Sequence, residues 1–123
     1  MADCLDDAAL FHGVSPVLLR AIAKWESGMR ATVVNRNKNG TEDIGLMQIN
    51  SSHLPRLAAF GITRQRLFDP CTNAYVGAWI LRANLDRYGP TWTAVGAYNA
   101  TSDDKRMAYA RNIYRTLLQA GTQ

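Results

Sequence analysis

The sequence predicts a single α+β domain, mostly α-helical, over residues 1–123. Helix signals recur along the chain: Ser-Pro or Asp-Pro pairs stand where a helix can begin, and Gly stands where it can end. One Asn-Gly pair between two short β-prone runs is the strongest local signal for a hairpin. Hydrophobic residues make up 47% of the chain, which is typical of a globular core. We therefore expect helices around one core, with a small β-hairpin beside them.

Two helices are predicted at the start of the chain. The first covers about residues 3–12 and ends at Gly13. The second begins at Ser15-Pro16, with Ser15 as the N-cap and Pro16 in the first turn, and it ends before Gly28. Apolar residues with i, i+4, i+7 spacing predict one buried face for this helix: Leu18, Ile22 and Trp25.

The predicted hairpin turns at Asn39-Gly40, between residues 32–34 and residues 44–50. If residues 44–50 form one strand, side chains alternate between its two faces. Leu46, Gln48 and Asn50 then share one face, and Met47 and Ile49 share the other. The two amides need partners. These are either the hydroxyl and acetamido groups of a sugar or the protein backbone, with Asn50 as the cap of the next helix.

Further helices are predicted in the second half. A short helix starts at Ser51-Ser52 and ends at Gly61, and a brief turn starts at Thr63. The longest helix runs from Asp69-Pro70 to Tyr88. A face of small and then large residues would pack it against a neighbouring helix: Ala74, Ala78, Leu81 and Leu85. Residues 90–100 form the next element, and a last helix follows a polar loop at residues 101–104 and ends near residue 118.

Composition narrows the class of protein. The net charge is +4, but no run of Lys and Arg exceeds two residues, so we expect no nucleic-acid partner. An ordinary basic surface and attraction to an anionic polymer such as a cell wall both remain open. No apolar run approaches the roughly 20 residues of a membrane span. The N-terminal stretch is acidic and short, so we expect no signal peptide within this sequence. Cys4 and Cys71 have no metal-type spacing and form either one disulfide or two buried thiols.

Glu26 is the first candidate catalytic residue. It follows Ile22 by one helical turn and therefore lies at the edge of the apolar face, near the helix C-terminus. Desolvation and the negative end of the helix dipole both raise the pKa of such a carboxyl group. A carboxylic acid that keeps its proton near neutral pH can act as a general acid. The alternative is a solvated Glu26 or one bridged to Arg30.

Asp43 is the second candidate, placed across the predicted hairpin from Glu26. One carboxylate in an apolar site and one in a wet site supply a proton donor and a standing anion, which is the arrangement used in glycoside hydrolysis. Alternatively, Asp43 pairs with Arg36 or Lys38. Tyr98-Asn99 offers a ring and an amide for a sugar, or else Tyr98 belongs to the core.

Three segments together resemble the motifs of the soluble lytic transglycosylase family. They are Glu26-Ser27, then Gly-Leu-Met-Gln-Ile-Asn at 45–50, then Ala-Tyr-Asn-Ala at 97–100, in the family's order. The resemblance covers nearly the whole chain. It is strongest to the small periplasmic enzymes that accompany type III secretion and related pilus or conjugation machines. The segments around Cys4 and Cys71 also resemble that group, which favours the disulfide, an oxidising compartment and a stabilisation of roughly 4 kcal/mol.

The resemblance implies a lysozyme-like fold with the hairpin beside the active-site cleft. It also implies cleavage of the β-1,4 bond between N-acetylmuramic acid and N-acetylglucosamine in peptidoglycan. Glu26 matches the family's catalytic acid, which then acts as a base so that the muramoyl C6 hydroxyl closes a 1,6-anhydro ring. The positions that match the family's substrate groove are Ser27, Met47, Gln48, Asn50, Tyr98, Asn99 and Tyr109.

The other implications concern partners and location. We expect a periplasmic monomer that binds glycan strands, and a secretion or pilus apparatus as its partner. We expect no cofactor, no metal and no membrane insertion. The sequence departs from the family at Thr101, where Gly is usual, and at Asp43, because the family generally works with one carboxylate. Asp43-Ile44-Gly45 is similar to animal-type lysozymes, so hydrolysis by Glu26 and Asp43 is the rival reaction. A non-catalytic wall-binding subunit is the rival of a different class.

Overall fold

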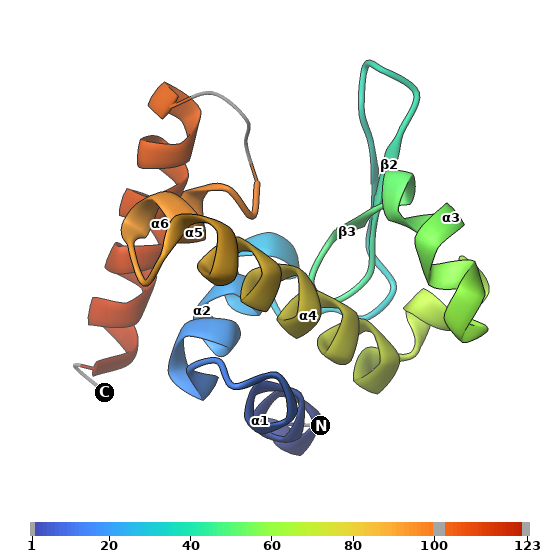
Figure 1. Cartoon of the computed structure of the whole chain (residues 1–123), viewed down its shortest axis with the longest axis horizontal. Helices are drawn as coiled ribbons and strands as arrows, with labels where there is room; N and C mark the ends of the chain where they lie inside the picture. The colour runs from blue at the N-terminus through green and yellow to red at the C-terminus, as the bar shows by residue number, and fades with distance from the viewer. Residues whose placement is uncertain (1, 100–102, 122–123) are drawn as a thin grey trace.

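Helix α4 (Pro70–Tyr88) is the element against which much of the chain packs. In the computed structural model, which describes residues 2–99 and 103–121, α4 contacts α1 (Ala2–His12), α5 (Trp92–Gly96) and the small sheet. Figure 1 shows α4 running across the middle, with α5 and α6 (Asp103–Gly121) at one end and the sheet at the other. The fold is mostly helical with a small antiparallel sheet, as predicted.

The remaining elements are short apart from α2. Helix α2 spans Pro16–Ser27 and contacts both α1 and α6. Along the sequence, four short helical segments connect the sheet to α4, namely η1 (Ser51–His53), α3 (Leu54–Leu57), η2 (Ala58–Phe60) and η3 (Gln65–Phe68). The predicted single helix over residues 51–60 is therefore three consecutive short pieces.

Capping side chains fix where the main helices start. Ser15 Oγ accepts a hydrogen bond from Leu18 N at 3.2 Å, and Asp69 accepts one from Thr72 N at 2.8 Å, which confirms both predicted starts. The predicted start at Pro90 is wrong by two residues, because α5 begins at Trp92 with Thr91 as its N-cap. Helix α6 begins at Asp103, inside the predicted polar loop, whereas Thr101 lies outside the described residues.

The sheet contains the predicted hairpin and one further strand. Strands β1 (Val34–Arg36) and β2 (Glu42–Ile44) pair antiparallel around Asn39-Gly40, with Gly40 at φ +89°. Strand β3 (Ile49–Asn50) pairs with the other edge of β2, so that Asp43 lies opposite Asn50. The hairpin is confirmed.

The prediction of one strand over residues 44–50 is wrong. The chain reverses between β2 and β3, with positive φ at Gly45 (+76°) and Gln48 (+55°), and Gln48 N bonds to Gly45 O at 3.1 Å. Side chains therefore do not alternate between two faces. Leu46 and Met47 are both fully buried, because the turn presses both into the core.

The side chain of Asn73, in α4, holds this turn by hydrogen bonds to its backbone. Its Oδ1 accepts a hydrogen bond from Met47 N at 2.7 Å, and its Nδ2 donates to Ile44 O and Leu67 O, each at 2.9 Å. Asn73 is fully buried, so its bonds have no competition from water. A Cβ added at Gly45 would lie 2.5 Å from Asn73 Nδ2, so this approach requires glycine.

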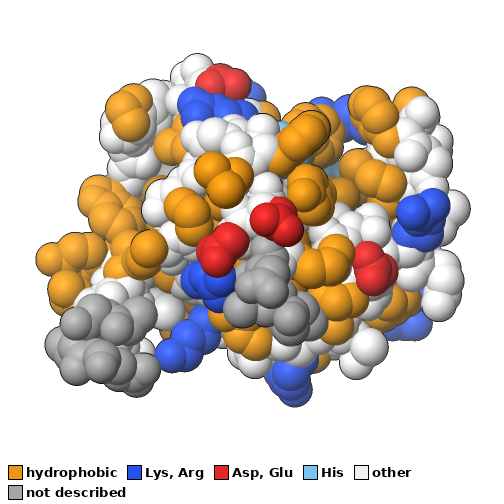
Figure 2. Space-filling model, turned by 90° about the horizontal axis from the view of Figure 1, so that it is seen from below, with side chains coloured by type: hydrophobic (Ala, Val, Ile, Leu, Met, Phe, Trp, Pro, Cys, Tyr) orange, Lys and Arg blue, Asp and Glu red, His pale blue; other side chains and the backbone are white. Residues whose placement is uncertain are grey.

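The surface mixes charged and apolar side chains. Figure 2, seen from below, shows acidic and basic groups interspersed among apolar ones on that face. Several large apolar side chains are well exposed, among them Leu10, Phe11 and Phe60. Over residues 2–99 and 103–121, no helix has the length and apolar content to cross a membrane.

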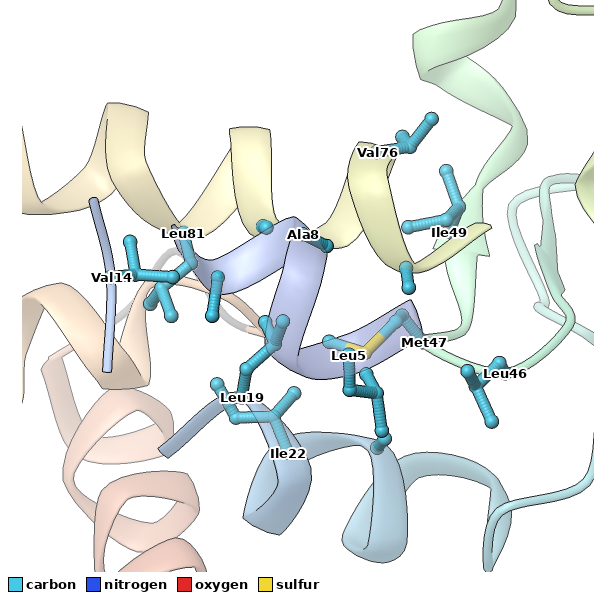
Figure 3. Close-up of a cluster of buried hydrophobic side chains, with 14 of the residues drawn as sticks. Leu5, Ala8, Val14, Leu19, Ile22, Leu46, Met47, Ile49, Val76 and Leu81 are labelled. Atoms are coloured by element: carbon cyan, nitrogen blue, oxygen red, sulfur yellow. The ribbon is translucent and has the colours of Figure 1, made fainter. Parts of the chain in front are cut away.

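The core lies between α1, α2, α4 and the turn at residues 45–48. Leu5 from α1, Leu19 and Ile22 from α2, and Met47 point toward one another in Figure 3. The predicted apolar face of α2 is partly wrong, since Trp25 is 48% exposed. Leu19, Ile22 and Ala23 form the buried face instead, and Glu26 continues it by one turn beyond Ile22.

A disulfide joins Cys4 in α1 to Cys71 in the first turn of α4. It encloses residues 5–70, including α2 and the whole sheet. The prediction of a disulfide over two free thiols is confirmed, and it adds a covalent bond to the contact between α1 and α4.

Replacing Asn73 by Leu tests how strongly one side chain supports the turn. Asn73→Leu leaves Met47 N, Ile44 O and Leu67 O buried without their partner, so we expect unfolding free energy to fall by roughly 3 kcal/mol in urea titrations.

Asn84→Leu is the matched control in the same helix. Among the described residues, Asn84 Nδ2 is buried without a hydrogen-bond partner, so its loss should cost little or stabilise the protein. Equal midpoints for the two variants would contradict the role given to Asn73.

Candidate active site

A cleft of about 500 Å³ brings the two predicted acids to one place. One side comes from the hairpin and β3, and the other from the end of α5 and the start of α6, which stand apart above α4 in Figure 1. Most of the residues that line the cleft are polar. The full lining is Glu26, Asn37, Asn39, Thr41, Asp43, Gln48, Ile49, Asn50, His53, Ile80, Tyr98, Asn99 and Lys105.

Glu26 reaches this cleft from the last turn of α2. The helix stops there because Gly28 adopts the left-handed conformation, with φ +63°, and donates its N–H to Lys24 O. Tyr109 O–H donates a hydrogen bond to Glu26 Oε2 at 2.6 Å. Arg30 does not bridge to Glu26, since its Nε donates to Ser27 O at 2.8 Å. Of the two alternatives, a bridge to Arg30 is therefore not what the structure shows.

The environment of Glu26 favours its neutral form. The pKa of this carboxyl is raised from 4.5 to about 7, chiefly by burial and in smaller part by the negative charge of Asp43. Hydrogen bonds from Tyr109 and Asn99 act in the opposite direction, because they stabilise the carboxylate. Glu26 can therefore both hold and release a proton near neutral pH.

Two stacked tyrosines lie beside Glu26, and of the two Tyr98 lines the cleft. The rings of Tyr98 and Tyr109 lie 6.5 Å apart at 18°, and Tyr98 O–H donates to Met47 O at 2.9 Å. Burial and the charge of Glu26 raise the pKa of both phenols, so both remain hydrogen-bond donors. Gly96 holds α5 against the Arg106 backbone of α6, where any Cβ would collide, and this contact sets the position of Tyr109.

Asp43 lies in a network of amides. Its Oδ1 accepts from Asn50 Nδ2 at 2.9 Å, and its Oδ2 accepts from Asn37 Nδ2 at 3.2 Å. The alternative of a pair with Arg36 or Lys38 is wrong, since neither cation forms an ion pair with Asp43 in the described part of the chain, and Arg36 contacts Glu42 instead. Asp43 is half-buried and lines the same cleft as Glu26.

The amides of the second motif are bonded within the protein. Gln48 Nε2 donates to Val33 O and Gly45 O, and its Oε1 accepts from Asn35 Nδ2 at 2.8 Å. Asn50 Oδ1 accepts from Ser52 N at 3.0 Å and so caps η1. This is the backbone-bonding alternative considered above. Both side chains still line the cleft.

Three predicted substrate-binding side chains are buried and do not line the cleft. Ser27 is 2% exposed, Met47 is 0% exposed and Tyr109 is 4% exposed. Ser27 Oγ donates to Ala23 O and accepts from Arg30 N, which closes the end of α2. Met47 packs on Gly77, where an added Cβ would lie 2.7 Å from Met47 Cγ. Because these side chains are inaccessible to a substrate, their role is to position Glu26 and Tyr98.

Several lining residues were not predicted from the sequence. Asn37 and Thr41 could have been found, because they lie in the same polar hairpin as Asp43. His53 and Lys105 carry no motif and are brought to the cleft by packing alone. Within the described ranges, no group of three or more His, Cys, Asp or Glu is arranged to hold a metal ion.

Relatives match along almost the whole chain. The Transglycosylase SLT domain matches residues 3–115. Protein IpgF of Shigella flexneri is 40% identical over 127 aligned residues, covering 99% of this chain and 84% of IpgF. Invasion protein IagB of Salmonella typhimurium is 43% identical over 118 residues, covering 92% of this chain and 74% of IagB.

A solved structure has the same fold. An X-ray structure of an inactive mutant of lytic transglycosylase Slt from Pseudomonas aeruginosa matches with a TM-score of 0.77 and 23% identity. The match covers 98% of this chain and 24% of that one, so this chain spans about a quarter of the length of Slt.

The helical fold, the small sheet and the cleft between them define a lysozyme-like domain. The chain belongs to the Transglycosylase SLT domain family and is thus a peptidoglycan lytic transglycosylase.

The raised pKa of Glu26 makes folding stability depend on pH. Between pH 4.5 and about 7 the folded protein holds a proton that the unfolded chain has released, so wild-type stability falls as pH rises. Gln has no such proton. We therefore expect the free energy of unfolding of Glu26→Gln, measured by urea titration, to rise relative to that of wild type as the pH increases. The increase from pH 4 to pH 8 should reach up to roughly 3 kcal/mol.

Glu42→Gln is the control for this measurement. The Arg64 guanidinium lowers the pKa of half-buried Glu42, so its proton is lost in both states above about pH 5. The difference between this variant and wild type should stay constant from about pH 5 to pH 8. A flat difference for Glu26→Gln as well would mean that Glu26 ionises like an exposed glutamate.

Proposed function

We propose that this protein cleaves the β-1,4 bond between N-acetylmuramic acid and N-acetylglucosamine, with Glu26 as general acid and then general base. One observation carries the proposal: the Glu26 carboxyl opens into a polar cleft, yet its pKa is raised to about 7 by burial. A group with that pKa transfers protons in both directions near neutral pH.

In the first step, protonated Glu26 donates its proton to the glycosidic oxygen as the bond to the sugar C1 breaks. Positive charge develops on the muramic acid ring. Asp43 stabilises this charge electrostatically, and the amides of Asn37 and Asn50 hold its carboxylate in place.

In the second step, the Glu26 carboxylate accepts the proton of the muramoyl C6 hydroxyl, whose oxygen attacks C1. The product is a 1,6-anhydro ring, and Glu26 regains its proton. The Tyr109 hydrogen bond supports the carboxylate between the two steps. We propose that Tyr98, Asn99, Gln48 and Asn50 line the sugar sites, because all four border the cleft.

We also propose the setting in which the reaction occurs. Residues 1–123 act as one domain and a monomer, in the periplasm, and open the wall locally for a secretion or pilus apparatus. The support is the disulfide, which favours an oxidising compartment, and the similarity to a relative named invasion protein IagB.

Glu26→Gln tests the proposed acid. The variant keeps the shape of the side chain and removes the proton, so we expect release of fragments from purified sacculi to fall roughly 10²- to 10⁴-fold. Mass spectrometry of the wild-type products should show ends lighter by one water, as the anhydro ring requires. Glu42→Gln, outside the cleft, should release fragments at the wild-type rate.

Other outcomes of this digestion favour the rivals. Ordinary reducing ends from the wild type would mean that water attacks, as in a lysozyme that uses Glu26 and Asp43. Undiminished lysis by Glu26→Gln would remove Glu26 from the chemistry. Sacculus binding without lysis by the wild type would indicate a non-catalytic wall-binding subunit.

Asp43→Asn tests the proposed anion. Loss of the charge should slow cleavage at least roughly tenfold, or about 1.4 kcal/mol of barrier. Because the charge of Asp43 raises the pKa of Glu26, the alkaline limb of the pH–rate profile should also move to lower pH.

The control for Asp43→Asn is Asp86→Asn, which removes an exposed carboxylate of α4 that pairs with Arg82. It should leave the rate and the pH profile unchanged. A wild-type rate with an unshifted profile in Asp43→Asn would return Asp43 to a purely structural role.

A further inference from the structure

Lys105 is a charged group in the cleft that the proposed reaction does not use. It stands in the first turns of α6, is exposed, and lines the cleft together with Glu26 and Asp43. Among the described lining residues it is the only Lys or Arg. His53 does not supply a second cation near neutral pH, because burial and the Arg56 charge lower its pKa.

The position of Lys105 relative to Glu26 follows from helix geometry. Lys105 precedes Tyr109 by four residues, so the two share one face of α6, about 6 Å apart along the helix axis. Tyr109 contacts the Glu26 carboxyl directly at 2.6 Å. Lys105 therefore stands one helical turn from the residue that holds the acid, and it lines the same cleft.

Lys105 has no protein partner across residues 2–99 and 103–121, where its side chain makes no recorded ion pair or hydrogen bond. Asp104 is adjacent in sequence, but successive helix residues do not face each other. The two acids of the cleft are already satisfied, Glu26 by Tyr109 and Asp43 by two amides. The positive charge of Lys105 is thus available to a ligand.

The proposed substrate limits what that ligand can be. The N-acetylated sugars of the glycan backbone carry no charge. The negatively charged groups of the strand are carboxylates on the substituent of muramic acid, either in the peptide stem or, where the stem has been removed, on the lactyl group itself. Without a cation, the Asp43 carboxylate in the cleft would repel this substituent.

We propose that Lys105 binds a carboxylate on the muramic acid substituent and so distinguishes wall glycan from uncharged N-acetylglucosamine polymers. Lys105 is a specificity-determining residue in this role and takes no part in proton transfer. The inference rests on the proposed function for the identity of the substrate. It does not depend on Glu26 being the catalytic acid.

Binding measurements in the Glu26→Gln background test this without turnover. Three probes of matched length are compared by calorimetry: soluble strands with peptide stems, the same strands after amidase treatment, and N-acetylglucosamine oligomers. We expect Lys105→Gln to weaken binding of carboxylate-bearing strands about threefold to fivefold, as for an exposed ion pair, and to leave the neutral oligomers unchanged. The effect should shrink between about 0.05 and 0.5 M salt.

The controls separate charge from other causes. Lys105→Arg should bind as the parent does, and Lys24→Gln, which removes an exposed charge of α2, should change no affinity. A loss confined to stem-bearing strands assigns the contact to the peptide. A loss on amidase-treated strands as well assigns it to the lactyl group.

Equal losses on all three probes, no loss on any, or no measurable binding would overturn the proposal. Failure of the proposed function shows itself separately, in the wild-type digestion of sacculi. Wild-type release of anhydro fragments together with unchanged affinities in Lys105→Gln would reject Lys105 alone.

Discussion

The hydrogen bond between Tyr109 and Glu26 is the contact on which the site depends. It joins the end of α2 to the middle of α6, two helices from opposite ends of the chain. Burial alone would favour a permanently neutral acid, whereas the phenol stabilises the carboxylate and so opposes that effect. The acid can therefore give up its proton and recover it. The left-handed Gly28 that ends α2 places Glu26, and the contact of Gly96 with α6 places Tyr109.

The second motif illustrates how a polar sequence can be structural. Gln48 and Asn50 resemble substrate-binding amides, but their bonds go to the backbone of the turn and to Asp43. Those bonds hold the turn in a conformation with positive φ at Gln48, which a non-glycine residue rarely adopts. The carbonyl of Met47, fixed by this turn, then holds Tyr98 in the wall beside Glu26. The motif thus shapes the cleft chiefly through hydrogen bonds within the protein.

Short sequence signals predicted the helix starts, because each start depends on residues within one turn. The starts of α2 and α4 follow from Ser15-Pro16 and Asp69-Pro70, because a cap and a proline act within one turn. The reversal at residues 45–48 escaped prediction, since it depends on Asn73, far along the chain. Lys105 was missed for the same reason: only tertiary packing brings the start of α6 to the hairpin.

The disulfide divides the cleft into halves that the chain restrains differently. Glu26, Asp43 and Asn50 all belong to the covalent loop closed by Cys4 and Cys71, whereas Tyr98 and Lys105 come after it. The second half is secured by packing of α5 and α6, which meet at Gly96 without room for a side chain. The geometry of the two acids is therefore restrained by a covalent bond, whereas the placement of Tyr98 and Lys105 depends on packing alone.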